Sequence, residues 1–195
     1  MVKPIFKSIP LDRGDPKSAR VFEPADPDAF IRDFTPSPEQ AQPEADAITS
    51  IHIQGIGTFH VSTRILQWLA LYRERHEDEL KHHFCHDFAA TFLNGNPENV
   101  AATYTRSRHA FPAIGQRLVS PPPVNSCVAL TNESGLIVHS VIAASSHPQQ
   151  LFASKFNFGK PYLHASRPIQ QRYGNVALNS VAHYGIARGR FGLSS

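Results

Sequence analysis

Three apolar runs in the second half of the chain constrain its fold more than any other feature. They cover residues 124–130, 136–144 and 149–156, and turn-forming residues fill each break between them. Asn, Ser, Gly and Pro between β-rich runs are typical of tight connections between neighbouring strands. The pattern therefore predicts a three-stranded antiparallel meander.

His139 is the one polar ring in the apolar middle run. A four-residue second turn places His139 directly opposite Ser154, on the same face of the sheet. A slip of one residue would bring Ala153 or Lys155 opposite instead. A buried histidine can simply bond a backbone carbonyl, but a hydroxyl beside an imidazole is also the arrangement that orients a catalytic base.

The sequence around Cys85 gathers reactive side chains at the predicted start of a helix. Residues 82–87 read His-His-Phe-Cys-His-Asp, and apolar positions then recur at helical spacing until Asn94-Gly95-Asn96-Pro97 ends the element. Cys85 is therefore expected in the first turn, where free backbone N–H groups point toward the sulfur. Such groups lower the pKa of a thiol and can hold an oxyanion.

The first 48 residues differ in composition from the rest. They hold eight of the sixteen prolines and carry six Lys/Arg against nine Asp/Glu, whereas the remainder has a net charge of +6. Because proline fixes φ and removes a hydrogen-bond donor, residues 1–48 are expected to form a largely irregular, extended arm, available to a partner or to secretion machinery. Residues 49–195 are expected to form the ordered domain.

Periodicity predicts the remaining elements. Residues 51–61 alternate around two glycines and predict a hairpin, and residues 62–80 predict an amphipathic helix. Residues 98–120 are expected to form a helix and then a loop through Pro112 and Gly115. Residues 176–186 alternate weakly, which predicts a strand at an edge of the sheet.

Composition excludes several classes of protein. Two cysteines in unlike contexts give no disulfide framework. No run approaches the about 18 apolar residues of a membrane span, and the first residues lack the apolar core of an export signal. The basic residues near the C-terminus are not interleaved with aromatic ones, so they predict no nucleic-acid surface. The chain is expected to be made in the cytoplasm, with leaderless secretion as a further hypothesis.

The order of these features resembles that of a known superfamily. A cysteine that begins a helix (Phe84-Cys85-His86-Asp87-Phe88-Ala89) is followed by a strand histidine (His139-Ser140-Val141) and then by a polar residue on the adjoining strand (Ser154-Lys155-Phe156). In this order the chain resembles the papain-like cysteine hydrolases, in the compact bacterial form of the NlpC-type peptidases and amidases. The resemblance covers residues 82–175.

The resemblance implies an α+β fold in which the cysteine-bearing helix packs on a small antiparallel sheet. It also implies Cys85 as nucleophile, His139 as base and Ser154 as orienting group, in an enzyme that hydrolyses or transfers an amide without a cofactor or metal. A peptide, a peptidoglycan stem or a protein would be the substrate. A bacterial effector or toxin is the hypothesis that this reading favours.

Other residues compete for these roles. Cys127 follows Asn125 and Ser126 and could be the nucleophile, although it falls in a predicted strand without a helix terminus to activate it. His164 and His183 could replace His139 as the base if the predicted register is wrong.

Two functions of a different class also remain open. His82, Cys85 and His86 have the i, i+3, i+4 spacing of one helical face, and His139 or Asp87 could complete a tetrahedral zinc site with them. A buried cysteine also behaves as a small hydrophobe. The chain could therefore be a zinc-binding protein or a non-catalytic protein-interaction domain.

Overall fold

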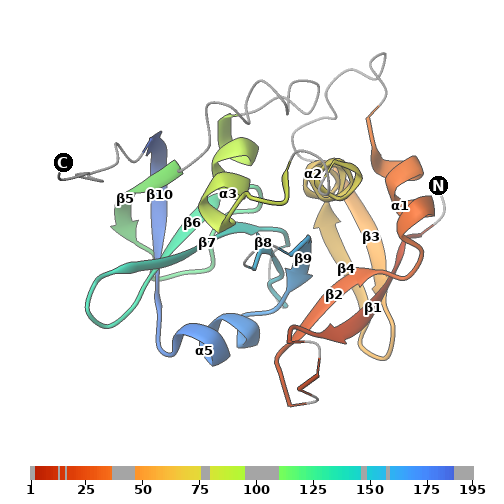
Figure 1. The fold of residues 1–195 in the computed structure, drawn as a ribbon, viewed down its shortest axis with the longest axis horizontal. Coiled ribbons are helices and arrows are strands. Elements are labelled where there is room, and N and C mark those ends of the chain that lie inside the picture. The colour runs from red at the N-terminus through yellow and green to blue at the C-terminus, as the bar shows by residue number, and fades with distance from the viewer. Residues whose placement is uncertain are drawn as a thin grey trace, which may run out of the picture.

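One curved β-sheet organises the molecule (Figure 1). The computed structural model describes residues 3–12, 14–15, 17–36, 47–75, 80–94, 110–145, 149–156 and 159–186. In these residues, ten strands form a single sheet in the order β4-β3-β1-β2-β9-β8-β7-β6-β10-β5. All neighbouring strands are antiparallel except β1 and β3, which are parallel.

The elements have the following bounds. The strands are β1 (Ile5–Pro10), β2 (Arg20–Pro24), β3 (Ile48–Ile53), β4 (Gly57–Ser62), β5 (Ala110–Arg117), β6 (Cys127–Thr131), β7 (Ile137–Ala143), β8 (Phe152–Lys155), β9 (Pro161–His164) and β10 (Ala177–Ile186). The helices are α1 (Pro27–Phe34), α2 (Thr63–Glu74), α3 (Cys85–Asn94) and α5 (Arg167–Tyr173).

The expected fold class is wrong. The prediction was a small antiparallel sheet carrying one helix, together with an extended N-terminal arm, but the sheet is mixed and large because β1 and β2 enter its middle. The prolines of this segment punctuate its elements: Pro10 and Pro24 end the two strands, and Pro27 begins α1. Proline is tolerated at these positions because its missing N–H has no obligatory partner there.

The predicted meander is confirmed, but its second register is not. Strands β6, β7 and β8 pair antiparallel in sequence order. Ala143 pairs with Phe152, so the connection is longer than the four-residue turn expected, and Val141 rather than His139 falls opposite Ser154. The shift is two residues. Because side chains alternate faces with a period of two, His139 and Ser154 still share a face.

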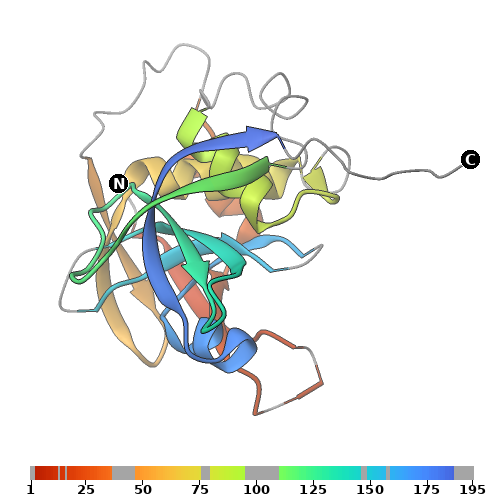
Figure 2. The ribbon, with the colours of Figure 1, turned by 90° about the vertical axis from the view of Figure 1, so that its left-hand side faces the viewer.

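Helices cover the sheet on both faces. Helices α2 and α3 lie on one face and α5 lies on the other (Figures 1 and 2). The larger buried cluster joins α1, α2 and α3 to the sheet through residues such as Trp68, Phe88 and Ile142. A smaller cluster under α5 includes Val141, Phe152 and Ile169. Successive residues of β7 and β8 therefore alternate between the face that α2 and α3 cover and the face that α5 covers.

Several predicted elements are confirmed with different bounds. The 51–61 hairpin is β3 and β4, and the predicted 62–80 helix is α2, which ends before residues 76–79, outside the described residues. Residues 110–117 form β5, although a loop was expected. The helix expected before that loop falls largely on residues 95–109, which are likewise outside the described residues.

Strand β10 lies inside the sheet, between β6 and β5, whereas an edge position was expected. Gly115 explains part of this pairing, because a Cβ there would approach the Ser180 Oγ of β10 to 2.5 Å. The two strands curve together across one end of the sheet (Figure 2). No helix in the described ranges is long and apolar enough to cross a membrane.

Candidate active site around Cys85

The Asp87 side chain fixes the start of α3. The Asp87 Oδ2 accepts a hydrogen bond from the Phe84 N–H (2.9 Å), which makes Asp87 the returning half of a capping box. Its Oδ1 accepts a second bond from the Ala110 N–H at the start of β5 (2.9 Å). The buried Asp87 therefore determines where the helix begins, and Cys85 is its first residue, as the sequence predicts.

The Cys85 sulfur faces backbone donors at that terminus. Burial raises the pKa of this thiol to about 11, and the nearby Asp87 raises it further, while the backbone N–H groups of Ser140, His86 and Cys85 itself lower it. Two of these donors come from the first turn of α3 and one from the middle of β7. The side chain is partly exposed. The thiol is thus protonated at rest, with peptide N–H groups ready to stabilise negative charge.

A buried lysine holds the segment that leads into α3. The Lys155 Nζ donates to the carbonyl oxygens of Leu80 and Lys81. Lys155 is fully buried, and burial lowers its pKa to about 8. It follows Ser154 directly in β8 and points to the opposite face of the sheet. Strand β8 therefore supports the turn before Cys85 on one face and presents Ser154 on the other.

A buried hydrogen-bonded cluster contains the predicted base. The His139 Nε2 lies 3.0 Å from the Ser154 Oγ, and the same oxygen lies 2.8 Å from the His164 Nε2. The His164 Nδ1 lies 2.7 Å from the Ala165 carbonyl oxygen, and the Tyr173 hydroxyl lies 3.3 Å from the His139 Nδ1. All three of His139, Ser154 and His164 are at most 1% exposed.

Two aromatic rings stack on His139. The Phe156 ring stacks on it at 5.0 Å and 19°, and the Tyr173 ring at 5.2 Å and 30°. Burial is the main cause that holds the pKa of His139 well below its ordinary value, with His164, His86 and Arg172 adding repulsion. Burial likewise lowers the pKa of His164 to about 4. Both imidazoles are neutral at pH 7.

Strand β7 joins the two halves of the site. The peptide N–H that approaches the Cys85 sulfur belongs to Ser140, and it is the amide that links Ser140 to His139. On the face of the sheet that α3 covers, the Ser140 Oγ lies 2.7 Å from the His86 Nδ1 and accepts from the Tyr184 hydroxyl (3.1 Å). The structure thus brings His139 and Ser154 into contact and places Cys85 at the backbone of His139.

Sequence reasoning missed three contributors. His164 was an alternative base, yet it bonds Ser154 as part of the same cluster. The sequence indicates no role for Tyr173 or Lys155, because their contacts depend on pairings between distant segments. His183 is exposed on β10. The one sequence signal for these two polar groups is the apolar residues that flank Lys155 and His164, which indicate that both side chains are buried.

The competing nucleophile and the metal site receive no structural support. Cys127 is buried in β6, and its thiol donates to the Ala89 carbonyl oxygen at 3.4 Å. Within the part of the chain that the structure describes, no group of three or more His, Cys, Asp or Glu side chains could hold a metal ion. The proposed zinc ligand His86 bonds Ser140 instead.

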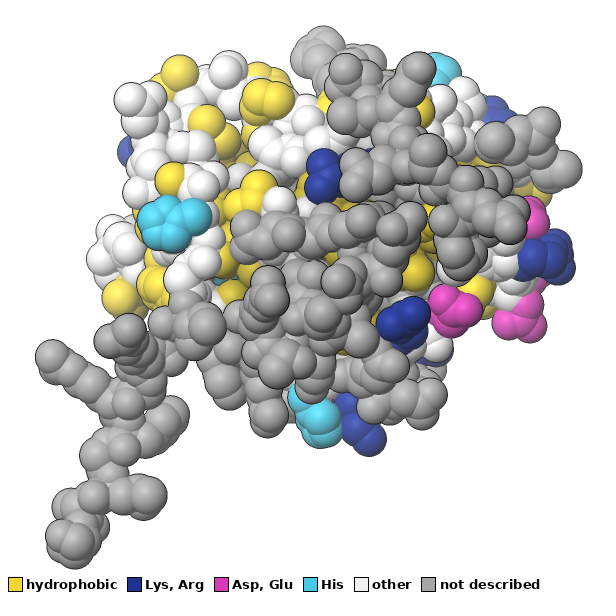
Figure 3. Space-filling model, turned by 90° about the horizontal axis from the view of Figure 1, so that it is seen from above, with side chains coloured by type: hydrophobic (Ala, Val, Ile, Leu, Met, Phe, Trp, Pro, Cys, Tyr) yellow, Lys and Arg dark blue, Asp and Glu magenta, His cyan; other side chains and the backbone are white. Residues whose placement is uncertain are grey.

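The end of the molecule that holds β5 and β10 is poor in charge. Seen from the side of α2 and α3, hydrophobic and neutral side chains predominate toward β5 and β10, whereas acidic and basic side chains gather at the opposite end (Figure 3). Phe84 is 43% exposed and Phe111 is 49% exposed. The Phe111 ring meets the His86 ring edge to face at 5.9 Å. An apolar group could therefore bind beside the thiol.

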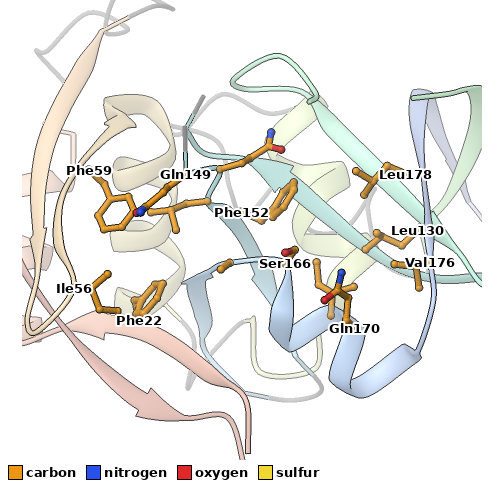
Figure 4. A pocket seen from close by; sticks show the side chains of 14 residues that line it. Phe22, Ile56, Phe59, Leu130, Gln149, Phe152, Ser166, Gln170, Val176 and Leu178 are labelled. Carbon is orange, nitrogen blue, oxygen red and sulfur yellow. The ribbon is translucent and has the colours of Figure 1, made fainter. Parts of the chain in front are cut away.

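A separate cavity lies on the α5 side of the sheet. Its volume is about 540 Å³, and the Phe152 ring projects into its middle (Figure 4). The other labelled side chains come from both ends of the sheet and from the α5 region: Phe22, Ile56, Phe59, Leu130, Gln149, Ser166, Gln170, Val176 and Leu178. No charged residue is among the described residues that line it.

Comparisons with known proteins leave the sequence resemblance as a prediction. No family model matches the chain, and no match was found among curated proteins or solved structures. The geometry around Cys85 and His139 is therefore the basis for a function.

Proposed function

We propose that the protein is a cysteine-nucleophile enzyme that hydrolyses an amide bond or transfers its acyl group. One observation carries the proposal: the Cys85 sulfur faces the peptide N–H between His139 and Ser140, at the first turn of a helix. In covalent acyl transfer, a base that is bonded to a third polar group takes the proton of the nucleophile. The sulfur meets the backbone of His139, and the proposal assigns the His139 imidazole as that base. Ser154 is that third group.

The proposed reaction has two stages, acylation of the Cys85 thiol and release of the acyl group. The Cys85 thiol gives its proton to the His139 imidazole as the sulfur forms a bond to the acyl carbon. Backbone N–H groups at the start of α3 stabilise the oxyanion of the tetrahedral intermediate. The C–N bond then breaks, and the imidazolium protonates the leaving amine. Water or an acceptor amine attacks the thioester, returns a proton through His139 and restores the thiol.

The resting charges favour general-base catalysis over a preformed ion pair. The pKa of Cys85 is about 11 because burial disfavours the thiolate, and burial also keeps His139 neutral. Proton transfer then accompanies attack on the substrate, so charge appears only where the N–H groups can stabilise it.

The flanking surface indicates the substrate class. Phe84 precedes the nucleophile and Phe111 contacts its neighbour His86, and both rings are substantially exposed. Exposed aromatic side chains beside a reactive group bind apolar surface. We infer that the acyl group or the adjoining side chain is apolar and uncharged.

Acyl trapping with p-nitrophenyl acetate tests the proposal. The Cys85 thiol is expected to take up the acetyl group, adding one acetyl mass to the intact protein, and the label should map to the peptide that holds Cys85. Cys85→Ala should abolish the adduct and Cys127→Ala should leave it. Labelling of Cys127 alone, or equal labelling of both variants, would contradict the proposal.

The cavity at Phe152 favours a second candidate, in a different class: binding of a neutral, mainly apolar small molecule without catalysis. Its volume of about 540 Å³ lies within the range of small-molecule sites, and a few neutral polar side chains such as Gln170 accompany the apolar lining. Burying a charged ligand against such a lining would be costly.

Two fluorescent probes that differ by one charge test this candidate. N-phenyl-1-naphthylamine is neutral, and 8-anilinonaphthalene-1-sulfonate carries a sulfonate on the same anilinonaphthalene framework. The neutral probe should bind more tightly, and Val176→Trp, which fills the cavity, should weaken it. Leu136→Trp adds the same ring at a 65% exposed position away from the cavity and should have no effect. Equal binding of both probes would exclude this function.

A further inference from the structure

The hydrogen bonds around Ser154 have a direction that one backbone carbonyl sets. The Ala165 oxygen can only accept, so the His164 Nδ1 at 2.7 Å from it must carry a proton. His164 is neutral because burial lowers its pKa. Its Nε2 therefore has a lone pair and accepts a hydrogen bond.

Ser154 passes this direction on to His139. A serine hydroxyl has one proton to donate. It donates that proton to the His164 Nε2 at 2.8 Å, so its oxygen is left as an acceptor toward the His139 Nε2 at 3.0 Å. The His139 Nε2 must then carry the ring proton. The lone pair of the neutral ring lies on Nδ1.

We propose that His164 is a positioning residue which, acting through Ser154, holds His139 in the tautomer protonated at Nε2. The Nδ1 atom is then the base for the Cys85 thiol. The tautomer follows from the hydrogen bonds together with the neutral state of the two imidazoles, whereas its catalytic consequence rests on the proposed function. A base whose tautomer is fixed in advance needs no rearrangement before it takes the proton.

Tyr173 agrees with this assignment at the other nitrogen. Its hydroxyl lies 3.3 Å from the His139 Nδ1 and is a donor at neutral pH, because burial raises its pKa. It can therefore donate to the lone pair that the hydrogen-bond relay from His164 through Ser154 leaves on Nδ1, and this bond must break when Nδ1 takes up the thiol proton. The stacked Phe156 and Tyr173 rings also restrict rotation of the imidazole.

Nitrogen-15 NMR of histidine-labelled protein tests the relay without any substrate. The His139 resonances, assigned by their loss in His139→Gln, should show a protonated Nε2 and a bare Nδ1 in the unaltered protein. In His164→Phe the Ser154 hydroxyl loses its acceptor and can turn toward His139, so a mixture of tautomers is expected. His164→Gln supplies an oxygen acceptor and should restore the single tautomer, while His183→Phe on β10 should change nothing.

The outcomes separate the relay from the catalytic proposal. A His139 protonated at Nδ1 in the unaltered protein, or one unchanged in a folded His164→Phe variant, would overturn the relay. If acyl trapping succeeds, His164→Phe should lower the acylation rate by roughly tenfold, part of the 10²–10⁴ that a general base contributes. That loss should appear in the maximal rate more than in the half-saturating concentration of p-nitrophenyl acetate. Failure of acyl trapping with the predicted tautomer present would overturn only the proposed function.

Discussion

The surroundings of the two cysteines differ in the groups that face the sulfur, although burial acts on both. Burial raises the pKa of Cys85 to about 11 and that of Cys127 to about 12. The Cys127 thiol donates to the Ala89 carbonyl, which would repel a thiolate. The Cys85 sulfur instead faces backbone N–H groups, which would stabilise one. The orientation of nearby peptides, more than depth, distinguishes a reactive cysteine from a structural one.

The largest expected effect comes from removing the base. His139→Ala should slow acetylation of Cys85 by p-nitrophenyl acetate by about 10²–10⁴-fold, the usual contribution of a general base. The rate is measured from the growth of the acetylated mass. Cys127 should stay unlabelled in both proteins. If the His139→Ala variant is folded by circular dichroism and its Cys85 reacts at the unaltered rate, the role of His139 as the base is contradicted.

Acid should weaken the fold through the buried histidine next to Ser154. The pKa of His164 is about 4 in the folded protein, against 6.5 for an ordinary histidine, so the unfolded chain binds more protons between these values. The contribution of His164 to the free energy of unfolding is fully present above pH 6.5 and should fall by about 3 kcal/mol as pH drops from about 6.5 to 4.

Urea unfolding at a series of pH values measures this loss. His164→Phe should remove the part of the pH dependence that His164 causes and leave the part due to His139, whose pKa burial also lowers. His183→Phe should keep all of it, because His183 is exposed. A slope that survives His164→Phe unchanged would show that other groups cause the acid sensitivity.

A substitution at Lys155 should change the reactivity of Cys85 without changing that of Cys127. Lys155→Met keeps the length of the side chain but cannot donate to the Leu80 and Lys81 carbonyls, so the turn before α3 should loosen. Acetylation of Cys85 should slow by about tenfold, since small displacements of a nucleophile are costly. The buried Cys127 should stay unreactive. An unchanged rate at Cys85 would mean that this support does not position the thiol.

The smallest effect on activity should come from Cys127 itself. Cys127→Ala leaves a small cavity at the contact with α3 and should cost about 1–2 kcal/mol of stability, while acetylation of Cys85 stays within about twofold. Chemical unfolding and acyl trapping on one preparation measure both. A large loss of acetylation in this variant would make Cys127 part of the reactive site.

The sequence predicts the local elements of the site better than their assembly. The helix start at Cys85 follows from local periodicity, and the meander follows from three apolar runs separated by turns. The shared face of His139 and Ser154 survives a wrong register because the error is an even number of residues.

Long-range pairing explains what the sequence does not predict. Strands β1 and β2 carry prolines at their ends, so their composition resembles that of an irregular arm, and their place beside β3 and β9 depends on residues far along the chain. The roles of His164 and Lys155 depend on the β8–β9 pairing and on the turn before α3. No local pattern encodes these contacts.

Alkylation of the native protein with iodoacetamide at pH 7 tests the central claim most directly. The rate at each cysteine is read by peptide mapping and mass spectrometry. The Cys85 thiol, which is partly exposed and faces backbone N–H donors, should react at least about tenfold faster than the buried Cys127. Equal and slow reaction of both cysteines would contradict the assignment of Cys85 as the nucleophile.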